Sequence, residues 1–136
     1  IASGTLVGRI YLIATMLTCV SAFGIFRHGG FNAGHGLGII ILVVLAVAWS
    51  AEHWRWYGSA SPYVTTVGYS FTVFLHLVPG LTESLTRFPL GSPLVSGPQD
   101  PLLQGIIGTC FVLFLIGVTL QIVRLRARQR LVPQSA

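Results

Sequence analysis

The stretch YVTTVGYSFTVFLHLVPGLTESLTR, residues 63–87, decides the class of fold. It begins as an apolar run long enough to cross a bilayer and ends in polar and charged side chains. Near its end come His76, Pro79 and, one helical turn apart, Glu83 and Arg87. An ionisable side chain inside a membrane span is costly and marks a candidate functional position. The stretch therefore predicts a membrane-spanning helix, but it does not specify a reaction.

The composition of the chain also indicates a membrane protein. Hydrophobic residues make up 53% of the sequence and charged residues 8%, whereas soluble domains carry about 25% charged residues. The mean hydropathy is +0.79. The length of 136 residues fits a single domain. The net charge of +5 comes mostly from arginines near the C-terminus, and nucleic-acid binding is disfavoured because no basic face with interleaved aromatic residues occurs elsewhere.

Four apolar segments are long enough to span a membrane, where about 20 residues suffice. The first segment lacks the charged start and small-residue cleavage pattern of a signal peptide, so we expect it to be a retained span. The predicted fold is therefore an all-α integral membrane protein, a single domain with four transmembrane helices in an up-down bundle. The predicted spans are residues 5–26, 35–53, 63–82 and 103–123, followed by a basic tail at 124–136.

Two pairs of glycines have the spacing that lets membrane helices approach closely. Gly4 and Gly8 precede and enter the first span, and Gly34 and Gly38 enter the second. Small residues four apart form such a surface because no side chain keeps the backbones apart. These four glycines are the predicted helix-packing positions.

Pro79 and Gly80 interrupt the third span. Proline removes one backbone hydrogen bond and clashes with the preceding turn, and the glycine beside it adds freedom. We expect a kink or an early helix end between Leu75 and Pro79. The carbonyls freed there could be satisfied by His76 or by threonine hydroxyls.

The arginines predict the orientation. Four spans place both termini on one side, together with Arg9, Arg55 and the basic tail, whereas Arg27 and Arg87 lie on the other. The positive-inside rule makes the arginine-rich side cytoplasmic. The tail arginines are expected to contact lipid headgroups; they are Arg124, Arg126, Arg128 and Arg130.

This topology predicts a polar cluster on the outer side, made of His28, His35, His76, Glu83 and Arg87. Each member also has a structural explanation. His76 is equally well explained as a buried imidazole bonded to a backbone carbonyl or to Tyr69. A helix-capping ion pair is favoured for Glu83 and Arg87, which stand in the favourable i, i+4 order, and an interfacial glycine-rich turn accounts for His28 and His35.

Other polar and thiol groups are expected to be structural. On the inner side, Glu52 and His53 are expected to lie at a solvated helix end, where they could pair with Arg9. Cys19 and Cys110 lie deep in the first and fourth spans, and we expect small apolar fillers rather than a disulfide. Residues 88–102 contain four prolines and are predicted to form an apolar surface loop.

Sequence motifs favour a non-enzymatic role and leave the cofactor unknown. The chain contains no HExxH, CxxC, P-loop or GxSxG motif. Haem b is disfavoured because His35 begins its span while His76 lies about six residues inside its own, a depth mismatch of about 8 Å. A metal ion held by His28, His35 and Glu83 is geometrically easier, although three unconnected residues give a weak signal.

The segments GRIYLIATMLTCVSAFGIF (residues 8–26), HGGF (28–31) and YSFTVFLHLVPGLTESLTRFP (69–89) resemble a group of small predicted bacterial membrane proteins that are classified as domains of unknown function. The resemblance extends from Gly8 to about Arg124 and is sharpest from His76 to Pro89. It implies a polytopic helical protein of the bacterial inner membrane and brings no activity with it. Related families often show a His-Arg element after the second helix, which EHWRWYG (52–58) matches only loosely.

Three functional hypotheses follow from the sequence. The first is an accessory or structural subunit of a larger membrane complex, respiratory or photosynthetic, which has other membrane proteins and the lipid bilayer as partners. The second is a small transporter or sensor that uses the outer polar cluster. The third is a metal- or haem-dependent redox protein. The first is favoured because the chain is small and carries little intramembrane chemistry.

Overall fold

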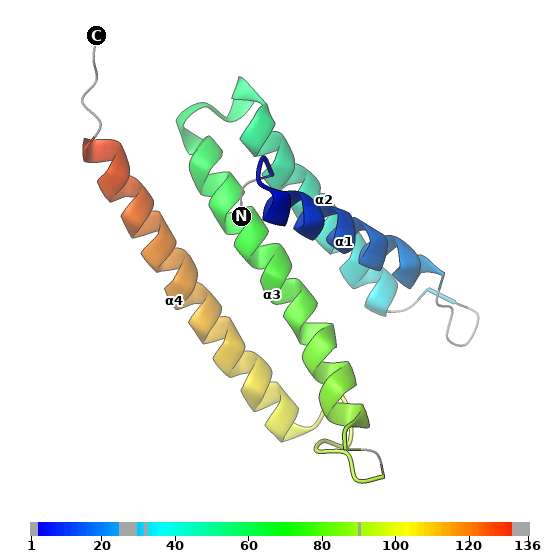
Figure 1. Cartoon of the computed structure of the whole chain (residues 1–136). Helices are drawn as coiled ribbons and strands as arrows, with labels where there is room; N and C mark the ends of the chain where they lie inside the picture. Colours follow the sequence, from blue (N-terminus) through cyan, green and yellow to red (C-terminus); the bar gives the residue numbers. More distant parts are fainter. Residues whose placement is uncertain (1–2, 25–29, 32, 90, 132–136) are drawn as a thin grey trace. The chain divides into compact units, whose positions relative to one another are not determined.

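The protein is all-helical, as Figure 1 shows for the computed structural model. The structure describes residues 3–24, 30–31, 33–89 and 91–131, and none of these forms a strand. Four of the helices are long and apolar enough to cross a membrane. The prediction of an all-α protein with four membrane-spanning helices is therefore confirmed, and these helices are compatible with an up-down bundle. The elements are α1 (Leu6–Phe23), α2 (Ala33–His53), the 3₁₀ helix η2 (Arg55–Ala60), α3 (Ser61–Arg87) and α4 (Pro101–Leu131).

Two helices end well beyond the predicted spans. The expectation that α3 ends near Pro79 is wrong, because the helix continues through this proline to Arg87. Hydroxyl groups in the following turns donate to helix carbonyls, from Thr82 to Val78 at 2.8 Å and from Thr86 to Thr82 at 2.6 Å. The predicted kink at Pro79 and Gly80 stays a prediction. α4 likewise continues into the basic segment, since arginine and leucine are good helix formers.

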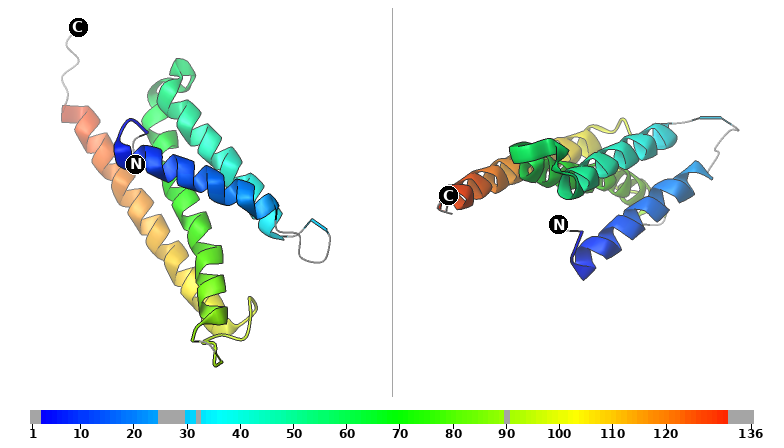
Figure 2. Two further views of the ribbon diagram at one scale, coloured as in Figure 1. Left: turned by 45° about the vertical axis from the view of Figure 1, so that its right-hand side comes forward. Right: turned by 90° about the horizontal axis from the view of Figure 1, so that it is seen from above.

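The chain divides into two compact units, residues 1–72 and 73–136, and α3 contributes to both. The first unit contains α1, α2, η2 and the first turns of α3. In it α1 and α2 run antiparallel, and the views in Figure 2 show them side by side. Thr5 caps α1, since its hydroxyl accepts a hydrogen bond from the Gly8 amide at 3.1 Å.

The core of the first unit joins its three helices. Leu45 and Ala48 of α2 pack with Tyr69 of α3, and Tyr11 and Leu12 of α1 cover them. A close approach of α2 and α3 is marked by a glycine that the sequence analysis did not single out, Gly68. A Cβ atom added there would lie 2.7 Å from the Ala48 Cβ, much closer than the usual carbon–carbon contact of about 3.5–4.0 Å.

The connection from α2 to α3 is a short turn held by hydroxyl groups. Gly58 has φ +49° and ψ −131°, which favours glycine because it has no Cβ. The Ser50 hydroxyl lies 3.1 Å from the Tyr57 hydroxyl, and the Ser61 hydroxyl donates to the Ala51 carbonyl. These contacts fix the end of α2 against the start of α3.

The second unit contains the rest of α3, the proline-rich loop and α4. Phe74 of α3 stacks on Phe114 of α4 with ring centroids 5.2 Å apart. The predicted surface loop is partly inserted into this unit: Val95 is buried, and its amide donates to the Leu85 carbonyl at 3.3 Å. Leu103, near the start of α4, is fully buried.

The start of α4 is fixed by Asp100. Its carboxylate accepts hydrogen bonds from the Leu102 amide at 2.9 Å, from the Ser96 amide at 2.9 Å and from the Ser96 hydroxyl at 3.0 Å. These donors lower the pKa of Asp100, the Ser96 amide most strongly. Asp100 is therefore a helix-capping residue that also ties the loop to the helix.

Candidate functional site

The carboxylate of Glu52, at the end of α2, connects three parts of the first unit. The backbone amide of Ser3 donates to its Oε1 at 2.9 Å, and the Tyr69 hydroxyl donates to its Oε2 at 2.8 Å. Tyr69 is only 2% exposed. Glu52 thus joins the segment before α1 to both α2 and α3.

This arrangement differs from the expected solvated helix end. Glu52 was expected near Arg9, but the structure gives its two oxygens donors from Ser3 and Tyr69. A partly buried carboxylate needs such donors because leaving it without them is costly. The donors are 49 and 17 residues away in the sequence, and the sequence carries no short-range pattern that would have indicated them.

His53 adjoins this carboxylate at the end of α2. Its Nδ1 lies 2.9 Å from the Trp49 carbonyl, and its Nε2 lies 3.4 Å from the Ser3 hydroxyl. The imidazole stacks on the Trp49 indole with ring centroids 4.5 Å apart. The ring is therefore oriented by α2 and by the segment before α1.

A second polar link lies deeper in the first unit. The Tyr11 hydroxyl of α1 lies 2.7 Å from the Thr72 hydroxyl of α3. Thr72 is fully buried, and its hydroxyl also bonds the Tyr69 carbonyl at 2.9 Å. These contacts join α1 to α3 by hydrogen bonds, which a membrane interior favours over unsatisfied hydroxyls.

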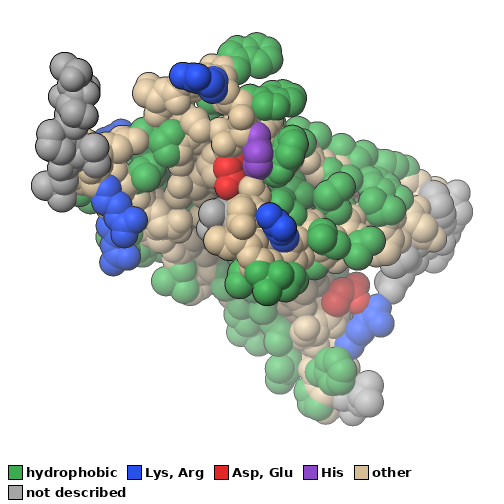
Figure 3. Space-filling model, turned by 45° about the horizontal axis from the view of Figure 1, so that its top comes forward, with side chains coloured by type: hydrophobic (Ala, Val, Ile, Leu, Met, Phe, Trp, Pro, Cys, Tyr) green, Lys and Arg blue, Asp and Glu red, His purple; other side chains and the backbone are tan. Residues whose placement is uncertain are grey.

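The Glu52 carboxylate borders a small open pocket at the turn between α2 and α3. Figure 3 shows a face of the molecule on which an acidic and a histidine side chain adjoin, with arginine side chains on either side. The pocket is partly polar and is lined by Ala51, Glu52, His53, Trp54, Arg55, Gly58 and Ser61. It combines one carboxylate, one imidazole and one guanidinium group in a short space.

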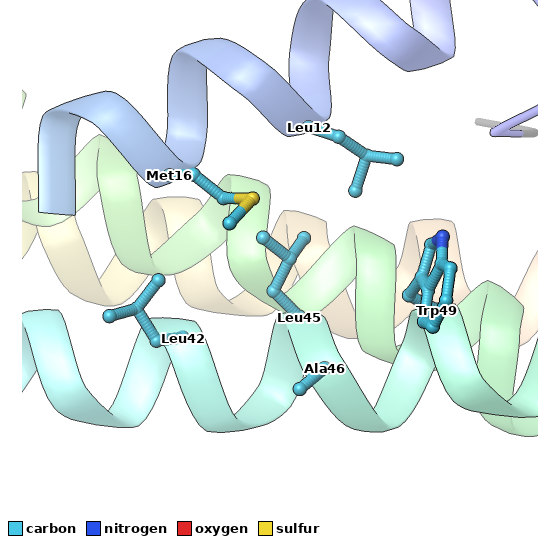
Figure 4. A pocket seen from close by; sticks show the side chains of 6 residues that line it. All are labelled: Leu12, Met16, Leu42, Leu45, Ala46 and Trp49. Atoms are coloured by element: carbon cyan, nitrogen blue, oxygen red, sulfur yellow. The ribbon is translucent and has the colours of Figure 1, made fainter. Parts of the chain in front are cut away.

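An apolar groove adjoins this pocket and runs between α1 and α2 (Figure 4). It has a volume of about 340 Å³ and an almost wholly apolar lining. Trp49 stands at the groove and also stacks on His53 of the polar pocket, so the two hollows are neighbours. The lining residues are Leu12 and Met16 of α1 with Leu42, Leu45, Ala46 and Trp49 of α2.

Two members of the predicted outer cluster, Glu83 and Arg87, are in contact in the second unit. Arg87 Nε and Glu83 Oε2 lie 2.6 Å apart, and the two side chains are 56% and 53% exposed. This is the i, i+4 ion pair that the sequence analysis gave as the structural explanation of these two residues. The pair is exposed, and such pairs stabilise a helix only slightly. His35 belongs to the first unit and His76 to the second, and His28 lies outside the described residues.

Both described histidines of that cluster have a buried ring nitrogen. His35 is 2% exposed, and its ring lies between Phe23 and Phe31, with centroids 5.9 and 5.3 Å away. The Nε2 atom of His76 is buried within α3. His35 is therefore surrounded by packed side chains, whereas His76 is only half-buried.

The predicted packing glycines have different surroundings. Gly8 and Gly38 are buried, and a Cβ at Gly38 would lie 3.8 Å from the Cys19 carbonyl oxygen. Gly34 is exposed, and a Cβ at Gly4 would meet nothing within 4 Å. Within each predicted pair, the second glycine is the one placed inside the protein.

The described residues include possible metal ligands and two cysteines. No group of three His, Cys, Asp or Glu side chains with metal-binding geometry occurs among them, and the suggested set His28, His35 and Glu83 includes one residue outside the described part. Cys19 and Cys110 are free thiols, as expected. The tail arginines Arg124, Arg126, Arg128 and Arg130 lie on exposed positions of α4.

The polar contacts of the described residues hold helices and loops of the chain together. The described acidic side chains all have donors: Glu52 has Ser3 and Tyr69, Glu83 has Arg87, and Asp100 has the loop amides. None of the family models, curated proteins or solved structures with which the chain was compared matches it.

Proposed function

We propose that this protein is an accessory or structural subunit of a larger membrane complex, such as a respiratory or photosynthetic complex of a bacterial inner membrane. The observation that carries the proposal is the surface of α4. This helix has 31 residues, and very few of them are buried within the chain. A membrane helix that packs so little within its own unit has a large surface available to other helices.

Three glycines on α4 support a protein partner rather than lipid alone. A Cβ atom at Gly105, Gly108 or Gly117 would meet no heavy atom within 4 Å. Large apolar side chains such as Val112 and Ile116 are exposed beside them, at 54% and 51%. Small residues among larger ones let two helices approach closely, and close packing is a main source of helix association in membranes.

The polar contacts of the chain favour this proposal over a transporter or sensor. A transport site needs polar groups that can exchange partners with a substrate. The Glu52 carboxylate is engaged by two donors, and Glu83 is paired with Arg87. These groups serve the fold of the chain itself.

The proposed orientation has both termini in the cytoplasm. Arg9, Arg55 and the tail arginines then lie on the cytoplasmic side, in keeping with the positive-inside rule. Single cysteines introduced at Ser59 and Ser96, in a background without the native cysteines, would check this. A membrane-impermeant maleimide applied from outside should label the cysteine at residue 96 and leave that at residue 59 unlabelled; the reverse pattern would invert the topology.

The test of the function is purification of the intact chain from its own membrane in a mild detergent. We expect one or more membrane proteins to co-purify at a constant ratio. Gly108→Leu should reduce that ratio several-fold, because an added side chain would separate the helices. Gly80→Leu is the matched control, since a Cβ at Gly80 on α3 also meets nothing within 4 Å.

Two outcomes would contradict the proposal. One is a chain that purifies with lipid alone under every mild condition. The other is a co-purifying protein whose ratio is unchanged by Gly108→Leu and by a leucine at Gly105, which would remove α4 from the interface.

A further inference from the structure

We propose that the groove between α1 and α2 is a binding site for an anionic phospholipid. One acyl chain would lie in the groove, and Arg9 and Arg55 would hold the phosphate at its polar end. This site lies in the first unit and does not depend on the proposed role of α4.

The groove has the shape and chemistry that an acyl chain needs. Its walls are the side chains of two antiparallel helices, and almost none of its surface is polar. The helices are close near Gly38, where a Cβ would lie 3.8 Å from the Cys19 carbonyl oxygen, and Figure 2 shows them diverging from that end. The groove extends between Leu12 and Met16 of α1 and Leu42 to Trp49 of α2, and a flexible chain can fill it from the lipid side.

The polar end of the groove is suited to a phospholipid headgroup. Trp49 of the groove stacks on His53, which lines the neighbouring pocket together with Arg55. A tryptophan whose ring contacts both apolar and polar groups is typical of the headgroup level of a bilayer. The change from apolar to polar lining thus occurs where a lipid changes from acyl chain to phosphate.

Charge at this end favours an anionic lipid. Arg9 lies one turn before Leu12 on α1 and is exposed, and Arg55 is exposed at the start of η2. The one carboxylate nearby, Glu52, already accepts hydrogen bonds from Ser3 and Tyr69. Two arginines therefore outnumber the single acidic group, and each adds affinity for an anionic headgroup.

The same end disfavours a protein helix as the occupant. Ser3 donates to Glu52 at 2.9 Å and its hydroxyl lies 3.4 Å from His53. The segment before α1 thus crosses to the end of α2 beside the groove. A helix about 10 Å wide would have to displace this contact, whereas an acyl chain would not.

The test uses the fluorescence of Trp49 in the full-length chain. Trp54→Phe and Trp56→Phe leave Trp49 as the only tryptophan. The protein is reconstituted in phosphatidylcholine vesicles that contain increasing fractions of phosphatidylglycerol with brominated acyl chains, which quench tryptophan on contact. We expect quenching to saturate at a low fraction of brominated phosphatidylglycerol, whereas brominated phosphatidylcholine should quench in proportion to its fraction.

Two variants identify the parts of the site. Arg9→Gln and Arg55→Gln together should raise the fraction of phosphatidylglycerol needed for half-quenching by more than tenfold, at about fivefold per arginine. The double variant Arg128→Gln with Arg130→Gln is the matched control. It should leave the fraction of phosphatidylglycerol needed for half-quenching unchanged. Ala46→Phe, which fills the groove without altering a charge, should reduce quenching by either lipid.

The proposal is overturned by any of three results. Equal quenching by the two brominated lipids in the parental protein would show ordinary contact with bulk lipid. An unchanged preference for phosphatidylglycerol in the double arginine variant would show that the phosphate is bound elsewhere. Unaltered quenching in Ala46→Phe would place the acyl chain outside the groove.

Discussion

Replacing Gly68 by alanine should separate α2 from α3 in the first unit. The added Cβ would lie 2.7 Å from the Ala48 Cβ and 3.4 Å from the Ala48 Cα. Carbon atoms in contact normally lie about 3.5–4.0 Å apart, so the two backbones would have to move apart by about 1 Å. A methyl group has no rotamer through which it could avoid the clash.

Two opposing effects determine the size of the change. Overpacking of this kind costs about 1–3 kcal/mol, while alanine is favoured over glycine inside a helix by about 0.8–1.0 kcal/mol. The net loss of stability in Gly68→Ala is therefore expected to be about 1 kcal/mol. Gly80→Ala gains the same helix propensity and meets no neighbouring atom. The two variants should thus differ by about 1–3 kcal/mol, which measures the contact alone.

The measurement is equilibrium unfolding in mixed micelles of a mild detergent and dodecyl sulphate, followed by circular dichroism. A double-mutant cycle with Ala48→Gly adds a second check, because removing the Ala48 methyl group should restore most of the stability lost in Gly68→Ala. If Gly68→Ala proves as stable as Gly80→Ala, or if Ala48→Gly gives no rescue, α2 and α3 do not make this contact.

Three further predictions concern polar groups. Tyr69→Phe should destabilise the protein by about 0.6–1.7 kcal/mol, the range for hydrogen bonds inside membrane proteins, and an unchanged unfolding midpoint would show that Glu52 does not depend on this hydroxyl. Hydrogen bonds from Ser96 and Leu102 lower the pKa of Asp100. The ionised carboxylate therefore contributes its full stabilisation of the folded state above the ordinary aspartate pKa of about 3.9. This stabilisation is lost as the pH falls through the lower pKa of the folded state. Hydrogen exchange at the first turn of α4 should therefore accelerate below about pH 4, and the same acceleration in Asp100→Ala would contradict the assignment. Arg87→Gln should change the unfolding free energy by less than about 0.5 kcal/mol; a larger loss would mean that the ion pair with Glu83 is shielded by a partner.

The fold class could be predicted from the sequence because each span carries its own signal. An apolar run of about 20 residues without charges indicates a membrane helix whatever surrounds it. The end of α3 could not be predicted in the same way. Pro79 removes one hydrogen bond from the helix, but the helix continues to Arg87. A single lost bond did not outweigh the need of a membrane segment to satisfy its other backbone groups internally.

The candidate site was predicted less well, for a different reason. The ion pair between Glu83 and Arg87 was expected because its members are one turn apart. Glu52 was assigned to a solvated helix end, since its donors come from Ser3 and Tyr69 in other elements. The contact at Gly68 was missed for a similar reason. Gly68 has no second glycine four positions away on α3, and its partner, Ala48, lies on α2.

The two donors of Glu52 also imply an order of assembly during synthesis, which runs from the N-terminus. Ser3 and α1 leave the ribosome before Glu52, so its Oε1 can be satisfied as soon as the α1–α2 hairpin closes. Its Oε2 must wait until Tyr69 emerges with α3. In the hairpin alone, only one oxygen of the Glu52 carboxylate has its hydrogen-bond donor. The second oxygen gains its donor when α3 packs against the hairpin. A nascent chain arrested before Tyr69 should remain accessible at Glu52 to carboxyl-directed reagents, and one arrested well beyond it should be protected.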